Sequence, residues 1–457
     1  MAQKLFARGL VCILGVSIIS SYSFAGYSVN AMCYLEDKSG AVTQPLNITA
    51  AEAAEEKDDQ VTRPTKVTAE DTREKFRIAS LSKILVTHWA VAKLGLEYRF
   101  KTKVSISATA PDKTCHVHFS GDQDIFFGKE MLQKAFTQLD EKAKAQGCAT
   151  VKQVSYDEKL VIPFHKATGT YVIQHRDDRA DGFRDGDPDN WYGPITTQSA
   201  LLNYVKKFAP ARFKGSSVGP VNSVSYEEYL KTATVKSYSF KSRPLYMMMR
   251  EFNAYSFNIP PNILFEKLGG TEAYSNFIEN RLGIRSQVSV KNGSGYPINS
   301  TKPDRFDNTV SCNAFVRIVQ DLDHMIKAYK GSKQFQLADV MPVGGKEELN
   351  STLKHYYGGS VFQNTIAGKT GTANEAITFG GMLSTSEGAI YFAVYTNPDS
   401  LDRTNAGLAR SYIRDVVTLF IGRLKLKAFN YEQIGAMTPT DDYANFVEET
   451  KLNNKLN

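Results

Sequence analysis

The chain has 457 residues, of which 42% are hydrophobic and 23% are charged, and its formal net charge at pH 7 is +7. These proportions are typical of a globular protein with a real hydrophobic core, and the length allows two or more domains. The sequence contains no long run of lysines and arginines, so we expect no nucleic acid among its partners.

The first 25 residues have the pattern of a secretory signal peptide. Lys4 and Arg8 precede an apolar stretch at 10–19, and Ser23-Phe24-Ala25 offers small residues for cleavage. The apolar stretch is too short to span a bilayer, although an uncleaved anchor is the alternative. We therefore expect an exported, periplasmic protein that is at most peripheral to the membrane.

Four cysteines remain after such a cleavage, and these are Cys33, Cys115, Cys148 and Cys312. Four cysteines can form three complete sets of pairs, and the sequence does not choose among them. Cys115 and Cys148 are the favoured pair because they lie in one segment. No C-x-x-C pattern occurs, so neither a zinc ribbon nor a redox dithiol is indicated, and we expect no metal and no cofactor.

The first strongly patterned element lies between Leu81 and Leu94. It is apolar almost all round, which predicts a buried helix that ends at Gly95. A possible strand at 27–35 and a polar, charge-rich stretch at 49–74 precede this helix. The polar stretch is typical of a solvated loop or a short surface helix.

Ser80 stands where the buried helix would begin, and Lys83 follows one turn later on the same face. A serine hydroxyl needs a base within hydrogen-bond reach to act as a nucleophile. A lysine among apolar neighbours loses its proton more easily and can serve as that base. The S-x-x-K pattern is weak alone, because Ser351 to Lys354 also matches it.

The pattern changes between about Phe100 and Phe240, which predicts an inserted domain. Stretches at 104–108 and 115–120 alternate like strands, and 128–147 is an amphipathic helix. His116 and His118 would share one face of a strand. No third ligand is evident, so a polar strand face is favoured over a metal site.

Asp177 to Asp189 holds six aspartates interleaved with glycines and arginines. This composition could bind calcium, but it does not match the spacing of an EF-hand. A solvated loop is the favoured interpretation.

Helical and strand patterns return after about residue 240. We expect helices at 244–255, 260–268 and 273–282, another between Thr309 and about Tyr329, strands at 366–371, 376–384 and 389–396, and a long amphipathic helix at 405–427.

Ser256-Phe257-Asn258 lies between the first two of these helices and is followed by Pro260-Pro261. On a short inter-helix loop the serine can relay a proton and the asparagine can hold a substrate amide. Two other S-x-N matches are less favoured. Ser28 to Asn30 precedes Ser80, and Ser311 stands at a helix start, where it is more simply a cap.

Lys369-Thr370-Gly371-Thr372 lies on the first strand expected after residue 365. The lysine and the two threonine hydroxyls supply a cation and donors for a carboxylate. Gly371 allows another backbone to approach closely, and the amide that follows it can join the Ser80 amide in an oxyanion hole. An ordinary strand that leads into a turn is the alternative for this stretch taken alone.

Joined in this order, S-x-x-K, S-x-N and K-T-G form the signature of penicillin-binding proteins and serine β-lactamases. The stretches 77–83, 94–102, 120–122 and 292–295 further resemble the penicillin-binding protein 4 (DacB-like) family of D-alanyl-D-alanine carboxypeptidases and endopeptidases. The resemblance touches most of residues 75–425.

The resemblance implies an α/β (α+β) fold, in which an antiparallel sheet flanked by helices forms a transpeptidase-like domain. It also implies a smaller, strand-rich domain inserted between the first two motifs. The expected organisation is a signal peptide at 1–25, a catalytic domain at 26–100 plus 241–430, an inserted domain at 101–240 and a polar tail at 431–457.

The function implied by the resemblance is that of a penicillin-sensitive serine DD-peptidase, which cleaves D-alanyl bonds of peptidoglycan stem peptides and is acylated by β-lactams. The resemblance assigns catalysis to Ser80, Lys83, Ser256, Asn258 and Lys369, and substrate and oxyanion binding to Thr370, Gly371 and Thr372.

Two alternatives remain open. A serine β-lactamase uses the same motifs but needs a fast deacylating base, and the comparable stretch, Glu227 to Leu230, lacks the expected asparagine after the leucine. The second alternative is a catalytically inactive peptidoglycan-binding protein.

Overall fold

A computed structural model describes most of the chain. The described residues are 31–37, 42–43, 74–109, 113–165, 169–171, 194–221, 225–226, 235–298, 304–344, 351–353, 363–373, 376–396, 410, 413–414, 417–418, 421, 424–429 and 443–449. The predicted signal peptide, the aspartate-rich segment and the stretch at 227–230 lie outside them, as does the charge-rich stretch at 49–74 except for its last residue.

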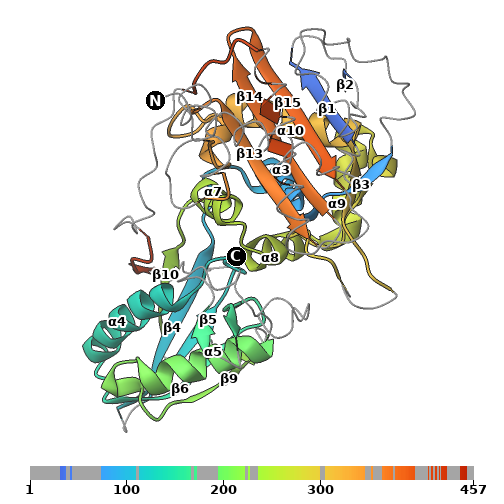
Figure 1. The fold of residues 1–457 in the computed structure, drawn as a ribbon. Coiled ribbons are helices and arrows are strands. Elements are labelled where there is room, and N and C mark those ends of the chain that lie inside the picture. The colour runs from blue at the N-terminus through green and yellow to red at the C-terminus, as the bar shows by residue number, and fades with distance from the viewer. Residues whose placement is uncertain are drawn as a thin grey trace, which may run out of the picture.

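A five-stranded antiparallel sheet forms the upper part of the molecule in Figure 1. Its strand order is β13-β14-β15-β1-β2, and the strands are β1 (Ala31–Glu36), β2 (Val42–Thr43), β13 (Ile366–Ala373), β14 (Ala376–Thr385) and β15 (Gly388–Thr396). The three strands expected after residue 365 are therefore present. β1 overlaps the possible strand at 27–35 and pairs with β15, which lies more than 350 residues further along the chain.

One face of this sheet packs on the main hydrophobic core. The helices on that side are α3 (Ser82–Leu94), α7 (Leu245–Tyr255), α8 (Ile259–Lys267), α9 (Gly270–Leu282) and α10 (Cys312–Ala328). Every residue of α3 from Ser82 to Val91 is buried, which confirms the buried helix that the apolar pattern predicts. A three-stranded sheet, in the order β11 (Val288–Ser289), β12 (Thr309–Ser311) and β3 (Lys75–Arg77), leads into the start of α3.

The opposite face of the five-stranded sheet is covered by the predicted C-terminal helix. Its described residues 410, 413, 414, 417, 418 and 421 are helical. Ile413, Val417 and Ile421 are buried in a cluster with side chains of β13, β14 and β15. The prediction extended this helix to 427, but Leu426 instead forms a bridge with Thr385 at the end of β14.

A six-stranded sheet forms the lower part of the molecule in Figure 1, in the order β16-β10-β4-β5-β6-β9. Its strands are β4 (Lys101–Thr109), β5 (Thr114–Ser120), β6 (Thr150–Tyr156), β9 (Ser217–Pro220), β10 (Val235–Lys241) and β16 (Val447–Glu448). Helices α4 (Lys129–Ala145) and α5 (Pro194–Lys207) contribute to its separate hydrophobic core. A small hairpin, β7 (Phe164–His165) with β8 (Thr170–Tyr171), lies beside them.

Part of the expected polar tail joins this lower sheet. Tyr443 donates a hydrogen bond to Glu130 at 2.6 Å, and the Phe446 ring stacks on Phe240 with 5.3 Å between centroids. β16 pairs with β10. Tyr443 and Phe446 give this segment apolar surface to bury. The expectation of a polar tail was based on the overall composition of 431–457, in which these two aromatic residues are outnumbered by polar ones.

Two disulfides are present among the described residues, one in each part of the molecule. Cys115 pairs with Cys148, which confirms the favoured pair, and Cys33 of β1 pairs with Cys312 at the start of α10. The second bridge spans 279 residues of sequence.

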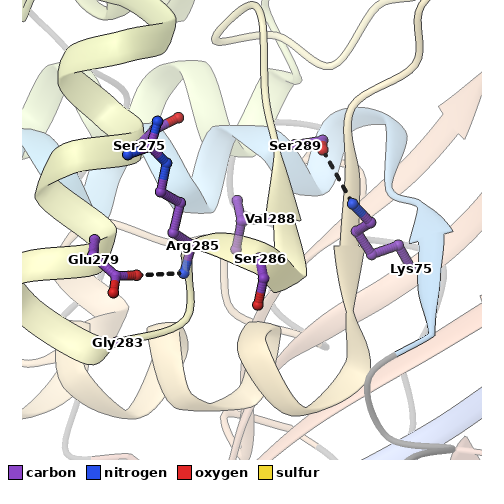
Figure 2. Close-up of a pocket in the computed structure, with 8 residues that line it drawn as sticks. All are labelled: Lys75, Ser275, Glu279, Gly283, Arg285, Ser286, Val288 and Ser289. Atoms are coloured by element: carbon purple, nitrogen blue, oxygen red, sulfur yellow. Dashed lines mark hydrogen bonds between the residues drawn. The ribbon is translucent and has the colours of Figure 1, made fainter.

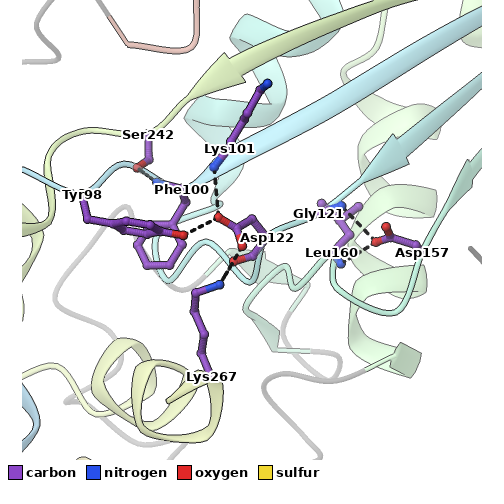
Figure 3. A network of polar contacts seen from close by, with 9 residues as sticks. All are labelled: Tyr98, Phe100, Lys101, Gly121, Asp122, Asp157, Leu160, Ser242 and Lys267. Carbon is purple, nitrogen blue, oxygen red and sulfur yellow. Dashed lines mark hydrogen bonds and ion pairs between the residues drawn. The ribbon is translucent and has the colours of Figure 1, made fainter. Parts of the chain in front are cut away.

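Asp122 joins the two parts of the molecule (Figure 3). Its carboxylate accepts hydrogen bonds from Tyr98 at 2.7 Å, from the Lys101 amide at 3.2 Å and from Lys267 of α8 at 2.6 Å. Burial opposes ionisation of Asp122, but the bonds from Lys267 and Tyr98 outweigh it and lower the pKa of this carboxyl. Nearby, burial raises the pKa of Asp124 to about 7. The hydrogen bonds that Asp122 accepts from Lys267 and from the Lys101 amide therefore hold α8 against the lower sheet.

Candidate active site

Ser80 lies in a tight turn that immediately precedes α3. The turn is a single 3₁₀ element, Ala79–Leu81, and Ala79 has a φ of +44°, a conformation that residues with a side chain rarely adopt. Ser82 Oγ donates to the Ala79 carbonyl at 2.8 Å, and Thr378 Oγ1 of β14 donates to the Ile78 carbonyl at 3.0 Å. These bonds hold the backbone of Ser80 between the helix and the sheet.

Lys83 is fully buried, and its amine lies within hydrogen-bond distance of three oxygen atoms, two of which belong to distant parts of the chain. The Nζ atom lies 2.8 Å from Ser80 Oγ, 2.9 Å from Asn258 Oδ1 and 2.9 Å from the Ser294 carbonyl oxygen. The first two contacts join the S-x-x-K and S-x-N motifs, 175 residues apart, at one atom.

Asn258 reaches Lys83 because of the local structure between α7 and α8. Ser256 ends α7 in the left-handed conformation with a φ of +60°, and Asn258 is the residue before α8. Pro260 and Pro261 open α8, where their missing amide hydrogens are not needed. The buried Phe257 ring anchors the loop against Phe126. Ser256 lies at the end of α7, two residues before Asn258, and its side chain is half-buried.

Ser294 was not among the predicted site residues, although the stretch 292–295 was recognised in the resemblance. Its amide donates to Asn262 Oδ1 of α8 at 2.7 Å, which orients its carbonyl group beside Lys83. Gly295 follows with a φ of +74°, and a Cβ atom there would lie 1.7 Å from the Ala79 carbonyl oxygen. The backbone at 294–295 thus packs directly against the Ser80 turn.

β13 carries the third motif along the other side of Ser80. A Cβ atom on Gly371 would lie 3.2 Å from the Ser80 amide nitrogen, 2.8 Å from the Ile78 carbonyl oxygen and 2.1 Å from Thr378 Oγ1. The glycine therefore permits the close backbone approach expected of it. Within the same strand Lys369 is fully buried and donates to the Thr370 carbonyl at 2.7 Å, whereas Thr370 is half-buried and Thr372 is exposed.

The other candidates from the sequence have structural explanations. Ser311 Oγ accepts from the Ala314 amide at 3.1 Å, which confirms it as the cap of α10. His118 lies 2.8 Å from Ser155 Oγ and stacks on Tyr226, and its burial lowers its pKa to about 4. Among the described residues, no cluster of three or more His, Cys, Asp or Glu side chains is arranged to hold a metal ion. None of the described helices is long and apolar enough to cross a bilayer.

A groove of about 620 Å³ lies between α9 and β3 (Figure 2). It is lined by Lys75, Ser275, Glu279, Gly283, Arg285, Ser286, Val288 and Ser289. None of these residues belongs to the three motifs, so the groove is distinct from the cluster around Ser80.

Comparison with known proteins gave matches among solved structures, whereas no protein-family model and no curated protein sequence matches the chain. The Bd3459 predatory endopeptidase from Bdellovibrio bacteriovorus, in complex with immunity protein Bd3460, is 25% identical with a TM-score of 0.67. The match covers 93% of this chain and all of that chain. The penicillin G acylated form of Bd3459 is also 25% identical, with a TM-score of 0.66 and the same coverage.

Penicillin-binding protein 4 (dacB) from Haemophilus influenzae is 10% identical, with a TM-score of 0.54 over 89% of this chain and 99% of that chain. The chain has a DacB-like fold. This finding confirms the resemblance inferred from the motifs, and it confirms the α/β, transpeptidase-like fold class. The DacB-like fold brings Ser80, Lys83, Asn258 and Gly371 together, although they lie on four separate elements.

Proposed function

We propose that the chain is a serine DD-peptidase that cleaves D-alanyl bonds of peptidoglycan stem peptides through an acyl-enzyme on Ser80. The observation that carries the proposal is the buried Lys83 amine, 2.8 Å from the Ser80 hydroxyl. The similar Bd3459 is described as a peptidoglycan endopeptidase, and it has been obtained acylated by penicillin G. β-Lactams are accordingly expected to acylate Ser80.

The contacts of Lys83 support its role as the base. Lys83 can act as the base only while its amine is neutral. A neutral amine has two hydrogens and one lone pair. The Asn258 amide oxygen and the Ser294 carbonyl can only accept, so they can hold the two hydrogens of the neutral amine, and its lone pair can then take the proton of the Ser80 hydroxyl 2.8 Å away. Loss of that proton makes Ser80 Oγ nucleophilic.

The oxyanion of the tetrahedral intermediate is held by the backbone amides of Ser80 and Thr372. The close approach of Gly371 to the Ser80 amide supports this pairing, since it puts the two backbones side by side. Amides fixed in this way stabilise the developing charge without reorganising. The strained Ala79 turn and its bonds to Ser82 and Thr378 keep the Ser80 amide in place.

The remaining motif residues bind substrate and complete the proton path. Lys369, Thr370 and Thr372 bind the carboxylate next to the scissile bond, and Asn258 holds the peptide amide. Ser256 relays the proton to the leaving D-amino acid. Water then hydrolyses the acyl-enzyme.

The proposal also covers the cellular location of the protein and its domain organisation. The two disulfides fit an oxidising compartment, and we propose that residues 1–25 direct export to the periplasm and are removed. Residues 26–100 plus 241–430 form the catalytic domain in this account, and 101–240 form the inserted domain.

The test of the proposal is digestion of purified disaccharide-pentapeptides and of their cross-linked dimers, followed by chromatography. Wild-type protein is expected to release D-alanine from the pentapeptide, to convert dimers to monomers, or both, and Ser80→Ala is expected to do neither. Protein that turns over penicillin rapidly but leaves both peptides intact would instead be a β-lactamase. Protein that binds the peptides without cleaving them would be an inactive binding protein.

A further inference from the structure

The segment that joins β5 to α4 enters the core of the other part of the molecule. Both elements belong to the lower sheet and its core, and residues 121–128 connect them. Ile125 and Phe126 are nevertheless buried in the main core with side chains of α3 and α8, whereas the next residue, Phe127, is buried in the lower core. Two consecutive phenylalanines thus anchor one segment in two different cores.

Phe126 lies against the central residue of the S-x-N motif. Its ring centroid is 6.4 Å from that of Phe257, and the two rings are inclined by 62°, the edge-to-face arrangement that aromatic pairs favour. Phe257 directly precedes Asn258, whose Oδ1 atom is 2.9 Å from the Lys83 amine. A side chain of the segment between β5 and α4 is therefore connected to Lys83 through two consecutive residues of the motif.

Polar contacts fix the position of Phe126. Asp124 Oδ1 accepts a hydrogen bond from the Phe126 amide at 2.9 Å, and the guanidinium of Arg243 lies 5.5 Å from the centroid of the Phe126 ring. Arg243 in turn donates to Glu251 of α7 at 2.6 Å. Asp124 and Glu251 are both buried, so these contacts are shielded from water and hold the ring in one place.

A second contact of the same segment acts at the far end of α8. Lys267 donates to Asp122 (Figure 3), but it lies about 12 Å along the helix axis from Ile259, the neighbour of Asn258. Loss of that contact leaves the loop before α8 packed on Phe126. Phe126 is therefore the contact of this segment that bears on Asn258.

We infer that Phe126 is a positioning residue for acylation, because by packing on Phe257 it holds Asn258 where the amide oxygen binds the Lys83 amine. The inference rests on the proposed function and adds to it a residue outside the three motifs. The segment between β5 and α4 then contributes to the rate of acylation as well as to the stability of the fold. Phe126 acts only through Phe257 and Asn258.

The experiment compares Phe126→Leu with Phe127→Leu in the rate of acylation by a fluorescent penicillin, below the melting temperature of both variants. Phe127→Leu is the matched control, since it removes the same ring from the neighbouring residue, which packs on Phe240 in the lower core with 6.0 Å between centroids. Both variants should melt at lower temperatures than wild type, because each leaves a cavity.

The two variants should differ in acylation. A misplacement of about 1 Å at a catalytic group can cost about a hundredfold in rate, so partial loss of support for Asn258 should slow Phe126→Leu about tenfold. Phe127→Leu should stay within about twofold of wild type. Phe126→Met and Phe127→Met form a second pair, since methionine fills a core without a ring, and the same order of rates is expected.

Asn258→Ala distinguishes positioning from a general loosening of the fold. Adding Phe126→Leu to Asn258→Ala should slow acylation by less than about twofold further, because the group to be positioned is already gone. A further tenfold loss in the double variant, or equal rates within either the leucine or the methionine pair, would overturn the role of Phe126 and leave the proposed function standing. Wild-type protein that penicillin does not acylate would overturn the proposed function, and the role of Phe126 with it.

Discussion

Lys83→Met is expected to lower the rate of acylation by benzylpenicillin by about a thousandfold, the contribution typical of a positioned general base. Methionine preserves the buried apolar stem but has no proton acceptor for the Ser80 hydroxyl. The Asn258 and Ser294 oxygens lose a donor, which costs about 1–3 kcal/mol for each buried group, so we expect a lower melting temperature but a folded protein.

Lys267→Met is the matched control for this change. Lys267 is half-buried, whereas Lys83 is fully buried, and it is likewise hydrogen-bonded, but its partner is Asp122 at the junction with the lower sheet. Its loss should reduce stability and leave acylation within a few-fold of wild type. Acylation is followed by intact-protein mass spectrometry against time. Lys83→Met protein that is acylated at more than a tenth of the wild-type rate would remove Lys83 from the role of base.

Gly371→Ala is expected to slow acylation about a hundredfold, the effect of losing one oxyanion-hole donor. The added methyl group would lie 2.1 Å from Thr378 Oγ1 and 2.8 Å from the Ile78 carbonyl oxygen, so β13 has to move away from the Ser80 turn. Such a movement separates the two amides that are proposed to bind the oxyanion. The binding affinity for penicillin before acylation should change less than the acylation rate.

Gly219→Ala of β9 provides the comparison for Gly371→Ala. It is also a strand glycine, but a Cβ atom there meets no heavy atom within 4 Å. This variant should acylate at the wild-type rate, as measured by stopped-flow fluorescence with a labelled penicillin. If Gly371→Ala matches it, the close approach of β13 to Ser80 is not needed for catalysis.

Local patterns in the sequence were sufficient for the elements that carry the site. The apolar stretch before Gly95 predicted α3 because burial on all sides leaves no polar face, and the S-x-x-K spacing needs only one helical turn. The Cys115–Cys148 pair was favoured, although the sequence did not fix it, since its two cysteines lie 33 residues apart on one segment. These features depend on periodicity or short spacing, which a single sequence contains.

Contacts between distant segments were not accessible in the same way. The Ser294 carbonyl that meets Lys83 is a backbone atom, so no side chain marks its role. The Cys33–Cys312 bridge joins residues 279 apart in the sequence, and β1 pairs with β15 across a still longer separation. Other segments with a similar pattern could equally have been the partners, so the sequence does not identify these contacts. Phe126 lies just before an expected amphipathic helix, but its contact with Phe257 follows from how the two parts of the molecule pack.

The most direct test of a penicillin-sensitive acyl-enzyme on Ser80 is peptide mapping of the purified protein after exposure to benzylpenicillin. We expect a mass increase of one penicillin on the peptide that contains Ser80, lost only slowly after the free drug is removed, and absent from Ser80→Ala. Penicillin attached to another residue, or a folded wild-type protein that acquires no label and destroys no drug, would contradict it.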